Sequence, residues 1–186
     1  MIQLDTSWLQ HVQKPARYTG GEYNSIVKEH STVDITMALG FPDVYEVAMS
    51  HLGIKILYGL VNRREDAVAE RVFAPWHDME EEMRKRNIPL FSLETRTSIK
   101  DFDVFAFTLQ YEMSFTNILN MLDLAGIPMY AKDRDMDFPL LVCGGPCAYN
   151  VEPIADFFDI VSLGESEEWG DEFIDLLKAE KAKGFP

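Results

Sequence analysis

Short apolar runs alternate with longer amphipathic segments along this chain, and that alternation limits its fold more than any other feature. The apolar runs have the length of β-strands, and in the segments between them apolar residues recur at helical spacing. Strands separated by helices of this length form parallel βαβ units. We therefore predict an α/β fold with a doubly wound, mainly parallel sheet of about five strands and helices on both faces. The predicted strands are residues 33–39, 71–74, 103–109, 140–143 and 159–163, and the predicted helices are residues 48–64, 75–85, 114–125 and 167–183.

The length and charge of the chain restrict its domain organisation and its partners. A chain of 186 residues can form one domain with a substantial core, which we assign to residues 33–186, preceded by an N-terminal arm of residues 1–32. The net charge of −14 repels phosphate backbones and anionic membranes, so we expect no direct binding to nucleic acid or to a membrane. The N-terminus lacks the pattern of a secretory signal, and no apolar stretch is long enough to span a bilayer. These features favour a cytoplasmic protein.

The loops that follow the predicted strands are the candidate binding site, because ligands of open α/β sheets bind beyond the carboxyl ends of the strands. The stretch LLVCGGPCAYN at residues 140–150 is the most informative, since its paired glycines let the backbone approach a ligand and donate its N–H groups. Such residues also serve simply to turn the chain, and that structural alternative stays open. The other candidate loops are residues 40–47, 108–114 and 164–167.

The cysteines and the histidine near these loops form no recognisable catalytic or metal-binding motif. Cys143 and Cys147 are separated by three residues, one more than in a thioredoxin-like pair, and the chain has no third cysteine for an iron–sulfur cluster. His51 could reach a bound ligand or metal, but no other His or Cys lies at ligand spacing from it. We therefore expect no metal site and no catalytic residue in this chain, and we interpret the cysteines as packing and loop residues.

Several long motifs, in a fixed order, resemble one protein family. The motifs are KPARYTGGEYN (14–24), FPDVYEVAMSHLGIKILYGLVN (41–62), ERVFAPWHDME (70–80), FTLQYEMSFTNIL (107–119) and CGGPCAYNVEP with DFFDIVSLGESEE (143–168). They are similar to the N-terminal region of uncharacterised radical S-adenosylmethionine (SAM) proteins, which carry a cobalamin-binding-like domain before the radical barrel. The resemblance implies a Rossmann-like module, similar to flavodoxin and cobalamin-binding domains, followed by a radical SAM barrel in a longer protein.

The resemblance also implies where cofactors bind. In related proteins a CxxxCxxC motif of the barrel holds a four-iron cluster, but here Asn150 stands where a third cysteine would be, so the [4Fe-4S] cluster and SAM are expected only in the barrel. Modules with a histidine ligand to cobalamin carry DxHxxG, whereas this chain has MSHLG at residues 49–53, which argues against histidine ligation. The residues expected to bind cobalamin are Phe41, Pro42, Asp43, Tyr45, Thr108, Leu109, Gln110, Gly144, Gly145, Pro146, Gly164 and Glu165.

Three functional hypotheses follow from the sequence. The first is an accessory domain that presents cobalamin, or a degenerate version of its site, to a C-terminal radical SAM domain of the same protein. The second is a scaffold without ligand, which docks the barrel or a partner protein. The third is an independent oxidoreductase that uses flavin or the cysteine pair, which the cysteine spacing disfavours.

Overall fold

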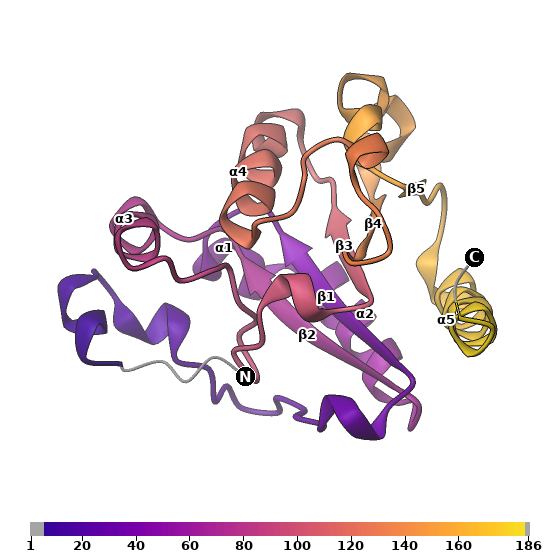
Figure 1. Ribbon diagram of the computed structural model, residues 1–186, viewed down its shortest axis with the longest axis horizontal. Helices are drawn as coiled ribbons and strands as arrows, with labels where there is room; N and C mark the ends of the chain where they lie inside the picture. Colours follow the sequence, from indigo (N-terminus) through magenta and orange to yellow (C-terminus); the bar gives the residue numbers. More distant parts are fainter. Residues whose placement is uncertain (1–5, 185–186) are drawn as a thin grey trace.

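The computed structural model describes residues 6–184 and contains one parallel five-stranded sheet with the strand order β2-β1-β3-β4-β5 (Figure 1). Every neighbouring pair of strands is parallel. The order reverses direction between β1 and β3, which is the switch point of a flavodoxin-like doubly wound fold. The predicted fold class is therefore confirmed. The strands are β1 (Ile35–Phe41), β2 (Ala67–Phe73), β3 (Val104–Thr108), β4 (Leu140–Gly144) and β5 (Ile160–Val161).

Helices cover both faces of the sheet. On one face α3 and α4 pack on a large apolar core, and on the other face α2 and α5 contact each other and the sheet (Figure 1). The α-helices are α1 (Tyr45–Ser50), α2 (Leu52–Asn62), α3 (His77–Arg86), α4 (Phe115–Ala125) and α5 (Ser166–Ala182). Short 3-10 helices lie at Thr6–His11, Pro15–Tyr18, His30–Thr32, Ile99–Asp101, Glu112–Ser114, Ala131–Asp133, Pro146–Asn150 and Glu152–Phe157.

Strand β3 shows how the two faces are built from one sequence. Phe105 belongs to the core under α3 and α4, whereas Val104 belongs to the core under α2 and α5. The rings of Phe105 and Phe107 lie against Gly40 of β1, where a Cβ atom would be only 2.8–2.9 Å from them. Gly40 therefore gives these two large rings the space they need in the α3/α4 face.

The long helix predicted over residues 48–64 is two helices in the structure. His51 has an extended backbone (φ −76°, ψ 121°), and it ends α1 and caps the N-terminus of α2. The apolar spacing predicted the helical content but not this break, because the backbone of a single residue leaves no mark on periodicity. Strand β2 also begins four residues earlier than predicted, at Ala67. Its buried Glu70 forms hydrogen bonds with His30 and Ser92. Because this charged residue interrupts the apolar run, the search for apolar runs missed the first part of the strand.

The N-terminal residues pack on the α/β domain. Trp8, Leu9 and Val12 are buried in the core under α3 and α4, and Ile26 exchanges two backbone hydrogen bonds with the hydroxyl of Tyr58 on α2. The assignment of residues 1–32 as a separate arm stays a prediction, and residues 1–5 lie outside the described part. Within residues 6–184, none of the helices is long and apolar enough to cross a membrane.

Candidate binding pocket

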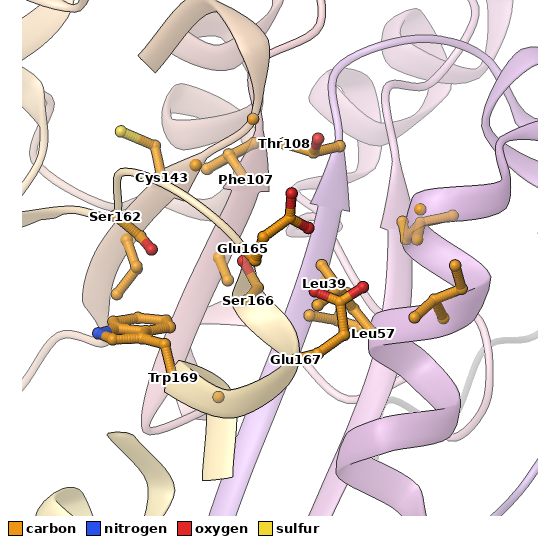
Figure 2. Close-up of a pocket in the computed structure, with 18 of the residues that line it drawn as sticks. Leu39, Leu57, Phe107, Thr108, Cys143, Ser162, Glu165, Ser166, Glu167 and Trp169 are labelled. Carbon is orange, nitrogen blue, oxygen red and sulfur yellow. The ribbon is translucent and has the colours of Figure 1, made fainter. Parts of the chain in front are cut away.

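A pocket of about 460 Å³ lies between α2 and α5 over β1, β3 and β4 (Figure 2). It extends to the loops at the carboxyl ends of these strands, next to the switch point of the sheet. Its volume falls within the range of about 300–1,000 Å³ typical of small-molecule sites. The structure thus places a hollow of ligand size where open α/β sheets bind their ligands.

The floor of the pocket consists of strand residues that face α2 and α5. Met37 and Leu39 of β1, Ala106 of β3 and Val142 of β4 line it. Ala106 occupies the middle of the sheet with a single methyl group, so the space above it stays unfilled. The walls are mainly apolar: Ile54, Ile56, Leu57 and Val61 come from α2, and Trp169, Phe173 and Ile174 come from α5.

Trp169 and Phe173 form one aromatic wall of the pocket. Their rings are stacked, with centroids 4.5 Å apart and planes 12° from parallel. They lie one helical turn apart on α5, which is the spacing that brings two side chains onto the same face of a helix. This wall offers flat apolar surface to a ligand.

His51 lines the pocket where α2 begins. Its Nδ1 accepts a hydrogen bond from the backbone N–H of Ile54 at 3.4 Å, and its ring lies 5.1 Å from that of Phe41. A Cβ atom at position 53 would be 2.9 Å from Cε1 of His51, so Gly53 lets the imidazole fold over the start of the helix. Because Nδ1 accepts, a neutral imidazole carries its proton on Nε2 and can donate it to a ligand.

The N-terminus of α5 supplies acidic groups to the pocket. Glu165 and Glu167 line it together with Ser166. In Figure 2 their carboxylates lie in the opening between Thr108 and Leu57. Within residues 6–184, neither carboxylate has a hydrogen bond or ion pair with another side chain, and no Lys or Arg lines the pocket.

The two glycines at the end of β4 have different surroundings. Gly145 has φ +99°, and a Cβ atom there would be 3.0 Å from the carbonyl oxygen of Leu109 and 3.1 Å from Oγ1 of Thr108. A Cβ atom at Gly144 would meet nothing closer than the carbonyl oxygen of Ser162, at 3.5 Å. Gly145 is thus required by the turn itself, which matches the structural alternative weighed for this loop.

The pocket brings together more than half of the residues predicted to bind a cofactor. Those that line it are Thr108, Gln110, Gly144, Gly145, Pro146, Gly164 and Glu165. They come from the loops after β3, β4 and β5, so three loops separated along the chain meet at one edge of the sheet.

The remaining predicted residues make other contacts and do not line the pocket. Phe41 and Leu109 are buried in the two apolar cores. Asp43 accepts a hydrogen bond from the hydroxyl of Tyr111 at 2.6 Å, and the carbonyl oxygen of Pro42 accepts one from Asn117 at 2.9 Å.

The last of them, Tyr45, turns toward the N-terminal segment. It packs edge-on against Phe73 and donates a hydrogen bond to Glu22 at 3.2 Å. Most of the loop after β1 is therefore engaged in contacts within the chain.

Several pocket residues were not predicted as binding residues. They are His51 and Leu57 beside α2, and Trp169 and Phe173 on α5. The apolar ones have the same helical spacing as core residues, so no signal in the sequence separates a pocket wall from a filled core. The one usable hint was His51, which the sequence placed near the start of a predicted helix and within reach of a bound ligand.

The two cysteines differ in their surroundings. Cys143 is buried, and burial raises the pKa of its thiol to about 12. Cys147 is partly exposed, and its pKa is raised by burial and by the nearby Glu112 carboxylate. Among the residues described, no group of three or more His, Cys, Asp or Glu side chains could hold a metal ion.

Comparison with known proteins shows where this domain occurs. A family model described as radical SAM proteins, N-terminal, matches residues 53–186. The chain is also similar to the uncharacterized protein MJ0966 of Methanocaldococcus jannaschii, with 28% identity over 134 residues that cover 70% of this chain and 24% of that protein. The chain thus spans about a quarter of the length of this relative. Since the family model matches well over half of its residues, the chain belongs to the family of N-terminal domains of radical SAM proteins.

Proposed function

We propose that this chain is an accessory domain that binds a corrinoid through the α2–α5 pocket and presents it to the radical SAM domain of the same protein. The observation that carries the proposal is the pocket itself: about 460 Å³ of mainly apolar space at the carboxyl edge of a doubly wound sheet, which can enclose one part of a corrinoid while the rest of the ligand lies outside it. Family membership implies a linked radical SAM domain. The corrinoid is the ligand that the motif resemblance of the sequence suggests for such a domain.

The polar groups of the pocket suit a large ligand with a neutral periphery. Thr108, Gln110, Ser162 and Ser166 supply hydroxyl and amide groups around an apolar interior. In this proposal the apolar floor and the aromatic wall hold a flat part of the ligand, while these polar groups fix its orientation. A bound corrinoid supplies a cobalt centre that can carry alkyl groups.

Binding of hydroxocobalamin to the purified chain tests the proposal. The expected result is a corrin absorption band that stays with the protein through gel filtration. The variant Leu57→Trp places an indole in the pocket and should sharply reduce retention, whereas Leu176→Trp, at an exposed position of α5 outside the pocket, should not affect it. If wild-type protein retains no corrin at ligand concentrations of about 100 μM, a range that includes ordinary cofactor affinities, the proposal is wrong.

A scaffold without ligand is the second candidate function. Three apolar side chains on loops after β3, β4 and β5 are largely exposed: Met113 (87%), Tyr149 (75%) and Leu163 (62%). Large exposed apolar side chains that share one edge of a domain are typical of interaction sites. If the scaffold is the whole function, the Leu57→Trp variant of the full-length protein keeps its activity, while Met113→Ser with Leu163→Ser, two positions outside the pocket, loses it.

A further inference from the structure

We infer that Glu165 and Glu167 make the pocket selective against anionic ligands, so that the part of the ligand facing the start of α5 carries neutral amides in place of carboxylates or phosphate. This inference rests on the proposed function, because it concerns the ligand of the same pocket. It assigns Glu165 and Glu167 as specificity-determining residues.

In the described part of the chain, the pocket is lined by acidic side chains without basic ones to balance them. Glu165 and Glu167 line it, whereas no Lys or Arg does so within residues 6–184. An anionic group that enters would lose water and gain no cationic partner, which is unfavourable. Sites for carboxylates and phosphates usually provide such a partner, most often Arg.

The N-terminus of α5 does not replace the missing cation. A helix of 17 residues has a positive dipole end that can attract anions. Here Glu165 is the capping residue, and Glu167 and Glu168 lie in the first turn. These three carboxylates offset the dipole, so an anionic ligand gains little at this end of the helix.

The hydrogen-bonding groups on both sides of the pocket match an amide. On the α2 side, Nδ1 of His51 accepts from Ile54, which leaves Nε2–H as a donor. On the α5 side, the carboxylates of Glu165 and Glu167 are acceptors without a partner among the described residues. The primary amides at the edge of a corrinoid provide both complements, since their carbonyl oxygens accept and their NH₂ groups donate. A carboxylate can only accept, and it would face two groups of its own charge.

Corrinoids provide a direct comparison, because their peripheral amides can be hydrolysed to carboxylates without loss of the ring or the nucleotide tail. We expect equilibrium dialysis to show that wild-type protein binds hydroxocobalamin at least about tenfold more tightly than its hydrolysed carboxylate derivative. Raising the ionic strength should reduce this ratio, because salt screens charges near the surface.

Substitutions then identify the residues responsible. In the double variant Glu165→Gln with Glu167→Gln, the ratio should fall to about twofold, because the glutamines keep the size of the side chains and remove the charge. The matched control is Glu172→Gln, which removes a charge from an exposed position of α5 beyond its first turn that does not line the pocket. This control should leave the ratio close to that of the wild type.

The outcomes separate this inference from the proposed function. If wild-type protein binds both corrinoids equally, or if the double variant keeps the full ratio, the selectivity assigned to Glu165 and Glu167 is wrong and the proposed function stands. If wild-type protein binds neither corrinoid, the proposed function fails, and this inference fails with it.

Discussion

The two faces of the sheet use the same strands in different ways. Under α3 and α4 the sheet contributes Phe105, Phe107 and Leu141, and these side chains join one continuous apolar core. Under α2 and α5, β3 and β4 contribute the smaller Ala106 and Val142 beside Met37 and Leu39 of β1, and a pocket of about 460 Å³ remains. The alternation of side chains along a strand thus lets one segment stabilise the fold on one face and leave space for a ligand on the other.

The reactivity of the two cysteines should show the largest difference. Cys143 is buried, and its thiol has a pKa raised to about 12, whereas Cys147 is partly exposed. At pH 8 we expect iodoacetamide to modify Cys147 at least about a thousandfold faster, because modification of Cys143 requires the domain to open. Mass spectrometry of quenched samples measures both rates. Similar rates would show that the α3/α4 face is not the closed core described above.

Shortening a side chain on the closed face, the one under α3 and α4, tests how much its packing contributes to the free energy of unfolding. Phe105 is fully buried, and Phe105→Ala should lower the free energy of unfolding by about 3–5 kcal/mol. Urea denaturation followed by circular dichroism measures this change. The comparison variant is Leu57→Ala, which shortens a partly buried side chain beside the existing pocket and should cost less than about 1.5 kcal/mol. Equal losses would mean that the two faces are equally well packed.

Two alanines of the sheet allow side chains to be enlarged instead of shortened, one on each face. Ala38 of β1 is fully buried in the core under α3 and α4, while Ala106 of β3 lies under the pocket. Ala38→Leu should destabilise the protein by about 1–3 kcal/mol, because it overfills a packed core. Ala106→Leu should stabilise it by about 0.5–1 kcal/mol, because it fills a hollow, and should also weaken corrinoid binding. A destabilising Ala106→Leu substitution would contradict the presence of free space above β3.

The closed face was easier to predict from the sequence than the pocket. Apolar runs and helical spacing located the strands and most helices, because each depends on residues close together in the chain. The carboxyl-end rule also placed Thr108, Gly144 and Glu165 near one edge. It could not tell toward which side each loop residue turns, and so Phe41 and Leu109, predicted to bind a cofactor, are found in the cores. Empty space depends on packing between distant elements, and no local pattern records it.

The smallest expected effect on stability comes from charge, at the contact between α1 and the N-terminal segment. The only buried residue of α1 is Ala48, so polar contacts contribute to holding this helix. Glu46 accepts hydrogen bonds from Lys14 and Arg17, both at 2.9 Å, and these bonds lower the pKa of its carboxyl group from 4.5 to about 2. A lowered pKa in the folded state means that the stabilisation is present above pH 4.5 and is lost as the pH falls toward 2.

The substitution Glu46→Gln should therefore lower the free energy of unfolding at pH 7 by no more than about 1 kcal/mol, because the carboxylate is partly exposed and water screens its charge. Near pH 2.5 the difference from the variant should become much smaller, since the wild-type protein has lost most of this stabilisation there and the variant never had it. The control Glu81→Gln changes an exposed carboxylate without an ion pair in the described part of the chain, and it should have no effect at either pH. A loss above about 2 kcal/mol for Glu46→Gln would mean that charge contributes more to this contact than a partly exposed ion pair normally does. The stability of the fold would then depend on a third contribution besides the packed face and the open face, namely the polar attachment of the N-terminal segment.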